Sequence, residues 1–301
     1  MKKLLFLFLT NLCIISSVSA QNSFRIMFYN VENLFDTEKS SKKNDGDFTP
    51  EGKLHWTYGR YQNKLNNIAK VITSLGEWES PAIVGLCEVE NERCMTDLTK
   101  HSLLKKQDYR YVITHCSDRR GINVALMYQR DQFKYLDHQD YKIKFPDNPK
   151  KVTRDILHVT GLAQSGDTLD IFVCHFPSRN GGEQESEPDR IFAASILKAK
   201  TDSLKQFRKT ANIIIMGDFN DEPSNKSIVQ QLKALPPDNN PKSDALYNLF
   251  YKFTKQENAG TYKFRNQWNV LDQIIISGNL MNRKQTYTFC RKLPEFFCVI
   301  L

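Results

Sequence analysis

The chain has few of the residues that break or divide a protein. Its 301 residues include only 13 Gly and 11 Pro, and they form no Gly/Ser or Pro linker, internal repeat or low-complexity tract. The loop-like stretches, residues 36–47 and 236–243, are short. These absences argue against a repeat or multi-domain architecture and favour one large domain with both helices and strands.

Long apolar runs are also scarce. The N-terminal run Leu4–Val18 is shorter than the roughly 20 residues that a membrane span needs. Two lysines precede it, Val18-Ser19-Ala20 resembles a small-residue cleavage site, and no lipoprotein box precedes Cys13. We therefore expect residues 1–20 to be a signal peptide, and the mature chain to be exported to the periplasm or beyond without a stable membrane anchor.

Metal-binding cysteine patterns are missing. No Cys-x-x-Cys or His/Cys spacing suggests structural zinc. Loss of Cys13 would leave six cysteines, and an even number in an exported chain permits disulfides. However, Cys87 and Cys174 interrupt apolar strand patterns, so these two are expected to pack as small hydrophobic residues.

The charge balance is basic. The formal net charge is +8, which falls to +6 without the two lysines of the signal peptide. A basic surface favours polyanions such as nucleic acid or anionic phospholipid. The alternative is a solvated basic surface with no partner.

One apolar run stops abruptly at polar residues. Ile213–Met216 is followed by Gly217-Asp218-Phe219-Asn220-Asp221, which is typical of a buried strand whose carboxyl end carries chemistry. A carboxylate can polarise water and an amide can hold an oxyanion, although Asp and Asn also close strands simply by forming turns.

Three other segments repeat this layout. They are residues 26–33, 83–91 and 171–178, and they supply Asn30, Glu88 and His175. If these groups converge with Asp218 and Asn220, they would form a metal-assisted phosphoester site.

These segments resemble the endonuclease/exonuclease/phosphatase superfamily, which includes pancreatic-type deoxyribonucleases, abasic-site endonucleases, sphingomyelinases and inositol polyphosphate phosphatases. The resemblance spans Phe24 to Ser277 and rests on six motifs in the family's order: residues 29–33, 86–90, 120–126, 175–178, 217–221 and 268–272. It implies an α/β (α+β) fold like that of deoxyribonuclease I, a four-layer sandwich of two mixed β-sheets flanked by helices, with the site at one rim.

The resemblance also implies roles for the motif residues. Glu88 would bind Mg²⁺ or Mn²⁺ with Asn30 beside it, because these ions prefer hard oxygen ligands. Asp218 would orient or deprotonate the attacking water, and Asn220 would donate hydrogen bonds to the pentavalent phosphate. The i, i+2 spacing of these two residues on an extended segment would point both side chains the same way.

Further residues carry weaker signals. The resemblance implies that His175 contacts the phosphate and that Asp272 is a carboxylate that orients a histidine. Asp221 reads as a turn residue. Arg179 and Arg190 either hold phosphate or face water.

Periodicity predicts the elements between the motifs. Helical spacing over Tyr58–Leu75 predicts an amphipathic helix, and a second helix is expected to start near Pro188. Further strands are predicted at residues 109–114, 122–128, 156–162, 169–175, 213–217 and 270–277. Many strands with few intervening helices predict mixed or antiparallel sheets.

The tail departs from the family, whose members end with an Asp-His pair. No His or Asp follows Asp272, and the apolar end, residues 296–301, has no evident partner. We therefore expect the domain, residues 21–301, to be incomplete at its C-terminus. The alternative is a divergent member of the family.

Together these observations predict an exported, monomeric, Mg²⁺- or Mn²⁺-dependent phosphodiesterase. Nucleic acid is favoured over phospholipid or sugar-phosphate substrates. The alternatives are a catalytically impaired or binding-only member that lacks the terminal pair, and a phosphatase or phospholipid phosphodiesterase.

Overall fold

The computed structural model of the protein describes residues 24–75, 80–282, 288–293 and 296–300. The expected signal peptide, residues 1–20, lies outside the described residues.

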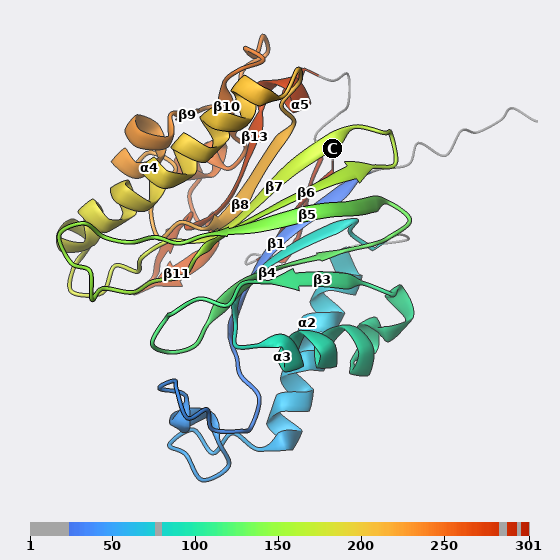
Figure 1. Ribbon diagram of the computed structural model, residues 1–301, viewed down its shortest axis with the longest axis vertical. Coiled ribbons are helices and arrows are strands. Elements are labelled where there is room, and N and C mark those ends of the chain that lie inside the picture. The colour runs from blue at the N-terminus through green and yellow to red at the C-terminus, as the bar shows by residue number, and fades with distance from the viewer. Residues whose placement is uncertain (1–23, 76–79, 283–287, 294–295, 301) are drawn as a thin grey trace, which may run out of the picture.

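Two large β-sheets form the centre of the molecule (Figure 1). The six-stranded sheet has the order β14-β15-β1-β2-β4-β3, made of β1 (Arg25–Leu34), β2 (Ile83–Val89), β3 (Arg110–Ile113), β4 (Asn123–Tyr128), β14 (Thr288–Leu293) and β15 (Phe296–Ile300). The seven-stranded sheet has the order β5-β6-β7-β8-β13-β10-β9, made of β5 (Phe133–Tyr141), β6 (Ile156–Ala163), β7 (Thr168–His175), β8 (Ile213–Asp218), β9 (Ala234–Leu235), β10 (Leu246–Asn248) and β13 (Asp272–Ser277). Both sheets are mixed, because β1 with β2 and β7 with β8 are parallel while most other pairs are antiparallel.

The remaining elements surround the sheets. The helices are α2 (Tyr58–Leu75), α3 (Glu92–Thr96), α4 (Glu183–Phe207) and α5 (Gly278–Met281), and the shorter helical segments are η2 (Gly46–Phe48), η3 (Asp97–His101), η4 (Leu103–Gln107), η5 (Ser227–Leu232) and η6 (Tyr251–Lys255). A separate hairpin consists of β11 (Tyr262–Phe264) and β12 (Gln267–Asn269).

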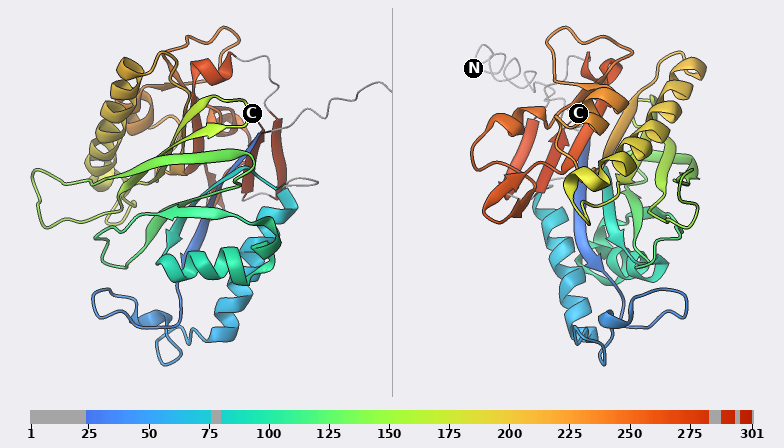
Figure 2. Two further views of the ribbon diagram at one scale, coloured as in Figure 1. Left: turned by 45° about the vertical axis from the view of Figure 1, so that its right-hand side comes forward. Right: turned by 90° about the vertical axis from the view of Figure 1, so that its left-hand side faces the viewer.

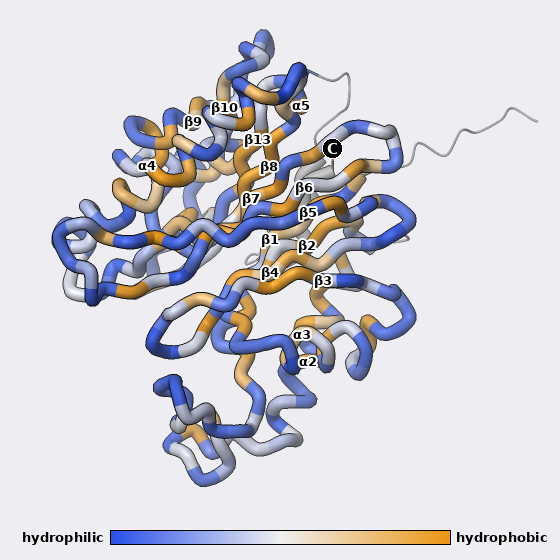
Figure 3. The backbone as a smooth tube through the Cα atoms, viewed as in Figure 1, coloured by the Kyte–Doolittle hydropathy of each residue, from blue (hydrophilic) through white to orange (hydrophobic). Residues whose placement is uncertain are grey.

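Three apolar cores hold the layers together. One lies between the two sheets, the second packs α2, α3 and η3 on the outer face of the six-stranded sheet, and the third packs α4 and η5 on the outer face of the seven-stranded sheet. Figures 1 and 2 accordingly show α2 and α4 on opposite sides of the paired sheets. In Figure 3 the strands carry the hydrophobic segments and the peripheral loops are hydrophilic. The expected four-layer sandwich is confirmed.

Helical spacing identified α2 correctly. Its buried positions are the apolar residues of the predicted stripe: Tyr61, Leu65, Ile68, Ala69, Ile72 and Leu75. The second helix, α4, begins at Glu183, before the expected start near Pro188. Gly181 and Gly182 have positive φ values of 85° and 131°, a backbone that Gly adopts readily, so the chain turns into the helix there.

The predicted strands are present within two residues of their expected limits, but β9, β10, β11, β12 and the long strand β5 were not foreseen. The clearest case is β5. This strand is a sheet edge and is largely exposed and polar, so it lacks the apolar pattern that identifies a buried strand. The C-terminal segment also differs from expectation. The backbone of Phe296–Ile300 pairs with β1, from Arg25↔Ile300 to Phe28↔Phe297, so this apolar segment does have a partner.

Cys87 and Cys174 are buried, unpaired thiols, as expected. None of the helices in the described ranges has the length and apolar character required to cross a membrane.

Candidate active site

The strand pairing brings the motif residues to one end of the sandwich. In the seven-stranded sheet, β8 lies between β7 and β13, so that Asp218 is paired with both His175 and Asp272. In the six-stranded sheet, Asn30 of β1 is paired with Cys87, the neighbour of Glu88. Both sheets therefore contribute to one site.

A hydrogen bond joins the two sheets within this site. The Asn30 side-chain amide donates to Asp218 Oδ2 at 3.1 Å. His175 Nε2 lies 3.8 Å from the same Asp218 oxygen and 4.0 Å from Glu88 Oε1. The structure thus brings together four of the predicted residues within direct contact distance.

Glu88 is held in an unusual backbone conformation. Its φ of 65° lies in the left-handed region, and the pairing of β2 with β4 shifts register between Cys87 and Val89. Such bulges redirect a side chain at the end of a strand. Burial raises the pKa of Glu88, although Arg120 and Arg154 oppose that rise.

The two aspartates have a high proton affinity. Burial raises the pKa of Asp218, while the Asn220 backbone N–H, Arg154 and Asn30 oppose that rise. Burial and the adjacent Asp218 carboxyl raise the pKa of Asp272 well above its usual range. Crowded carboxyls whose charge repulsion needs relief are a frequent feature of catalytic and cation-binding sites.

His175 is 4% exposed, and its surroundings disfavour the protonated imidazole. Burial, with the positive charges of Arg154 and Arg120, lowers the pKa of His175 well below its ordinary value. Its Nδ1 is buried and finds no hydrogen-bond partner among the described residues. A buried polar atom without a partner is costly, so this nitrogen is suited to meet a bound ligand.

Asn220 does not follow the expected geometry. It lies beyond the end of β8, and its φ of 49° is left-handed, so the alternation rule for an extended segment was the wrong reason to pair it with Asp218. Its backbone N–H donates to Asp218 Oδ1 at 2.9 Å, and its side-chain amide donates to Phe176 O at 3.1 Å. Asn220 therefore orients Asp218 and the loop after β7.

Asp272 is expected to orient a histidine, but in the described part of the chain no hydrogen bond joins it to one. Instead, its backbone N–H donates to Thr261 Oγ1 at 2.9 Å, and its carboxyl lies next to that of Asp218. In this structure Asp272 acts on Asp218 through its charge or its proton.

Asp221 and Arg190 form a fully buried pair. Arg190 Nε donates to Asp221 Oδ1 at 2.7 Å, and both side chains are 0% exposed. Asp221 is thus more than a turn residue, and Arg190 neither faces water nor reaches a phosphate. Arg179 lies nearer the site, because its Nε donates to Asn220 O at 2.8 Å and its charge lowers the pKa of Asp218.

Arg154 is a site residue that the sequence did not reveal. It is 5% exposed, donates to the Phe176 carbonyl, and lies 3.6 Å from Asp118. Its charge acts on Glu88, His175 and Asp218. The only sequence signal was a charged residue two positions before an apolar strand, which by itself indicates nothing specific.

Two guanidinium atoms have spare donor capacity. Arg154 Nε and Arg179 Nη2 are buried without a hydrogen-bond partner in the described residues, like His175 Nδ1. Guanidinium groups bind phosphate oxygens well. The site therefore combines carboxylates that suit a cation with donors that suit an anion.

The donor set fits a divalent cation of the Mg²⁺ type. Glu88 and Asn30 offer hard oxygen atoms, and positive charge would relieve the mutual repulsion of Glu88, Asp218 and Asp272. Within the described ranges, no group of three or more His, Cys, Asp or Glu side chains is arranged as a metal cage.

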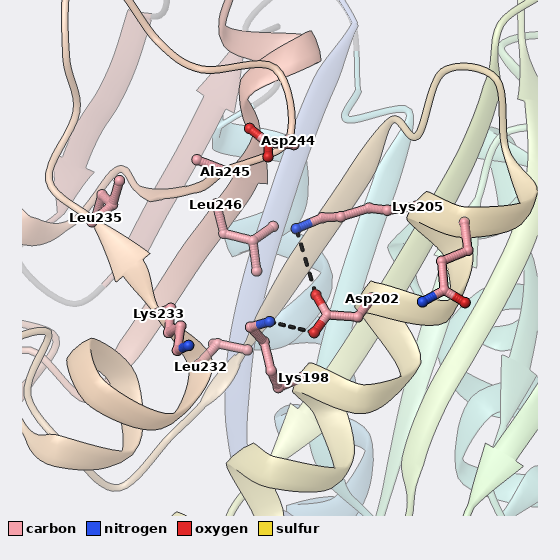
Figure 4. Close-up of a pocket in the computed structure, with 10 residues that line it drawn as sticks. Lys198, Asp202, Lys205, Leu232, Lys233, Leu235, Asp244, Ala245 and Leu246 are labelled. Atoms are coloured by element: carbon pink, nitrogen blue, oxygen red, sulfur yellow. Dashed lines mark hydrogen bonds and ion pairs between the residues drawn. The ribbon is translucent and has the colours of Figure 1, made fainter.

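A separate cavity of about 540 Å³ lies elsewhere, between the C-terminal half of α4 and the segments around β9 and β10. Figure 4 shows Lys198 and Lys205 of α4 directed toward Asp202 in this cavity. It contains none of the motif residues. We therefore place the chemistry at the strand ends and not in this cavity.

Comparisons with known proteins agree with the fold. The chain matches the model of the endonuclease/exonuclease/phosphatase family over residues 25–299. No curated protein sequence matches it significantly.

Solved structures of similar fold include the human Nocturnin catalytic domain, at 16% identity and a TM-score of 0.57, covering 92% of this chain and 93% of that one. Zebrafish (D. rerio) TDP2 in complex with a single-strand DNA product has 14% identity and a TM-score of 0.56, covering 93% and 98%. The Bacteroides thetaiotaomicron mannosyl-6-phosphatase Bt3783 has 15% identity and a TM-score of 0.59, covering 92% and 98%.

At such identities these structures show a shared fold, while the family model spans nearly the whole sequence, including every motif residue of the site. This chain belongs to the endonuclease/exonuclease/phosphatase family.

Proposed function

We propose that this chain is an exported Mg²⁺- or Mn²⁺-dependent phosphodiesterase that hydrolyses nucleic acid. The observation that carries the proposal is the meeting of Glu88, His175 and Asp218 within 4.0 Å at the ends of strands from both sheets. The family's phosphoester chemistry and the basic net charge, which is +6 without the two lysines of the expected signal peptide, support it. Export rests on the signal-peptide pattern of residues 1–20.

Each side chain has a chemical task in this proposal. Glu88 and Asn30 would hold the cation, which supplies positive charge to the phosphate oxygens when bound. Asp218 takes a proton from the attacking water, and its raised pKa makes it a stronger base than an ordinary carboxylate. Two hydrogen bonds, from Asn30 and from the Asn220 backbone, fix its orientation.

The remaining groups bind the phosphate. His175 Nε2 lies 3.8 Å from Asp218, and Arg154 and Arg179, which have spare N–H groups, act on the Asp218 carboxyl through their charge. Donors that are already fixed in place stabilise charge as it develops on the phosphate without further reorganisation.

The first prediction tests the site directly. Single-stranded DNA should be cleaved with Mg²⁺, and EDTA should abolish cleavage. Asp218→Asn and Glu88→Gln should each lower kcat by roughly 10²–10⁴-fold, the typical contribution of one positioned acid–base group. Asp244→Asn, at the distant cavity, is the matched control and should retain full activity. Full activity in both site variants would refute the assignment.

A phosphomonoesterase is a second candidate, supported by the shared fold of the mannosyl-6-phosphatase. The same cation and phosphate contacts serve both reactions. Comparing nitrophenyl phosphate with its bis ester separates them, because a monoesterase prefers the first substrate and a diesterase the second.

A binding-only member is the third candidate. The side-chain amides of Asn30 and Asn220 both already donate to protein acceptors at 3.1 Å, which limits what they offer a transition state. Salt-sensitive binding of DNA without any turnover would favour this candidate.

A further inference from the structure

The hairpin of β11 and β12 presents an exposed pair of aromatic rings. Tyr262 and Phe264 are 47% and 53% exposed. Because they are two residues apart on one strand, they lie on the same face, and their rings are nearly parallel, with centroids 6.4 Å apart and an interplanar angle of 12°. We call these two rings the aromatic face.

One cationic side chain lies against the aromatic face, and another lies on the opposite face of the hairpin. The Arg265 guanidinium lies 5.2 Å from the Phe264 ring centroid, and Lys263 Nζ lies 5.4 Å from that of Trp268 on the other side of the hairpin. Aromatic rings with adjacent positive charges are the usual means of binding single-stranded nucleic acid, since bases stack on the rings while the charges meet the phosphates.

The hairpin is attached directly to the site. Thr261, the residue before Tyr262, accepts hydrogen bonds at its Oγ1 from the backbone N–H groups of Leu271 at 3.0 Å and Asp272 at 2.9 Å. Asp272 in turn is paired with Asp218. Figure 1 places β11 at the end of the sandwich where β8 ends and β13 begins. The aromatic face therefore begins one residue beyond a direct contact with the strand that carries Asp272.

We propose that the aromatic face stacks the nucleobases next to the scissile phosphate of single-stranded nucleic acid. This inference rests on the proposed function. It specifies single-stranded nucleic acid as the substrate class and names Tyr262 and Phe264 as the residues that recognise it. Stacking on rings discriminates little between bases, so the hairpin provides affinity for the strand with little sequence preference.

The shape of the hairpin tip argues against insertion into a membrane. The turn residues are Arg265 and Asn266, with φ values of 45° and 66°, so a cation and an amide occupy the position that would enter the lipid first. The aromatic rings lie along the side of the hairpin instead. This arrangement suits a strand that lies across the hairpin.

The test measures binding without turnover. The full chain in EDTA is titrated with a single-stranded oligodeoxynucleotide that carries 2-aminopurine, whose fluorescence is quenched on stacking. Wild type should quench the probe. Tyr262→Ala/Phe264→Ala should lose the quenching and bind roughly 10- to 100-fold more weakly, as expected for the loss of stacked bases. Tyr262→Phe, which keeps the ring, should bind like wild type.

Two controls sharpen the result. Phe207→Ala removes another exposed ring, 83% exposed at the end of α4, and should have no effect. An oligonucleotide with abasic positions should bind wild type and the double variant equally. The inference would be overturned if wild type and the double variant bound the 2-aminopurine strand equally. It would also be overturned if the double variant lost as much affinity for the abasic strand as for the intact strand.

Other outcomes separate this inference from the proposed function. Cosedimentation with phosphatidylglycerol vesicles that depends on the aromatic face, without quenching of the probe, would overturn the inference in favour of a membrane surface. Cleavage of DNA that is unchanged in kcat and KM in the double variant would also overturn it and would leave the proposed function standing. Quenching by a protein that cleaves no DNA would support the inference while the proposed function fails.

Discussion

At the residue scale, the site is governed by buried charge. Three carboxyls with raised proton affinity meet in the site, and the charge of a buried arginine that no motif indicated acts on two of them, Glu88 and Asp218. Glu88, His175 and Asp218 could be named from the sequence because each ends an apolar strand. Arg154 could not, because its role arises only when the loop before β6 approaches Asp218.

Arg154→Gln should therefore change both affinity and pH dependence. The positive charge of Arg154 lowers the pKa of Asp218 and Glu88, so its removal raises both values further. The base then ionises only at higher pH, and the acidic limb of the kcat/KM profile should move to higher pH. If Arg154 contacts the phosphate as proposed, loss of that contact should also raise KM roughly 10- to 100-fold.

Arg119→Gln is the matched control, because this neighbouring arginine is exposed. It should leave the pH profile unchanged. Steady-state rates between pH 5 and 9 measure both variants. An unshifted acidic limb in Arg154→Gln would show that Arg154 does not influence the ionisation of the base.

At the element scale, α4 shows how a helix can be foreseen while its buried face is not. The apolar residues of α4 indicated a helix, but its buried stripe also contains Ser186, Arg190 and Thr201. Arg190 connects α4 to the loop after β8 through Asp221, which Ser227 of η5 also contacts at 2.6 Å. Local periodicity cannot reveal a buried ion pair between residues 31 positions apart.

Arg190→Met should destabilise the fold, because it leaves the Asp221 charge buried without its partner. Breaking a buried pair in this way typically costs about 3–5 kcal/mol. Arg190→Met/Asp221→Leu should recover a large part of that loss, since no charge is then buried. Urea unfolding followed by circular dichroism measures both variants. A double variant as unstable as the single one would contradict this account of the pair.

At the scale of the whole molecule, the sandwich and the mixed sheets could be predicted, whereas the edges could not. Buried strands have continuous apolar runs, so β1, β2, β7 and β8 were evident. The edge strand β5 and the hairpin of β11 and β12 are largely exposed and lack such a signal. The pairing of β15 with β1 joins opposite ends of the chain, which no local pattern encodes.

Close contact between the two sheets depends on Gly85. A Cβ atom there would lie 2.4 Å from Met216 Sδ and 3.3 Å from Phe28. Gly85→Val should therefore overpack the core between the sheets and destabilise the protein by about 1–3 kcal/mol. Met216→Ala should partly rescue it by making room.

Gly59→Ala in α2, where nothing lies within 4 Å of the added atom, is the control. It should be neutral or slightly stabilising, because Ala favours helix over Gly. Thermal unfolding measures all three. Wild-type stability in Gly85→Val would show that the sheets have more freedom to separate than their packing indicates.

The hydrogen bond from Asn30 to Asp218 joins the two sheets, and it has a thermodynamic consequence. A ligand held by residues of both sheets binds only when the sheets are assembled, so it shifts the unfolding equilibrium of the whole domain. At a hundredfold excess over its dissociation constant, such a ligand adds about 2.7 kcal/mol of stability. If the substrate binds at the rim as proposed, its phosphate would also preserve the fold, and the protein would be most vulnerable to proteolysis where its substrate has run out.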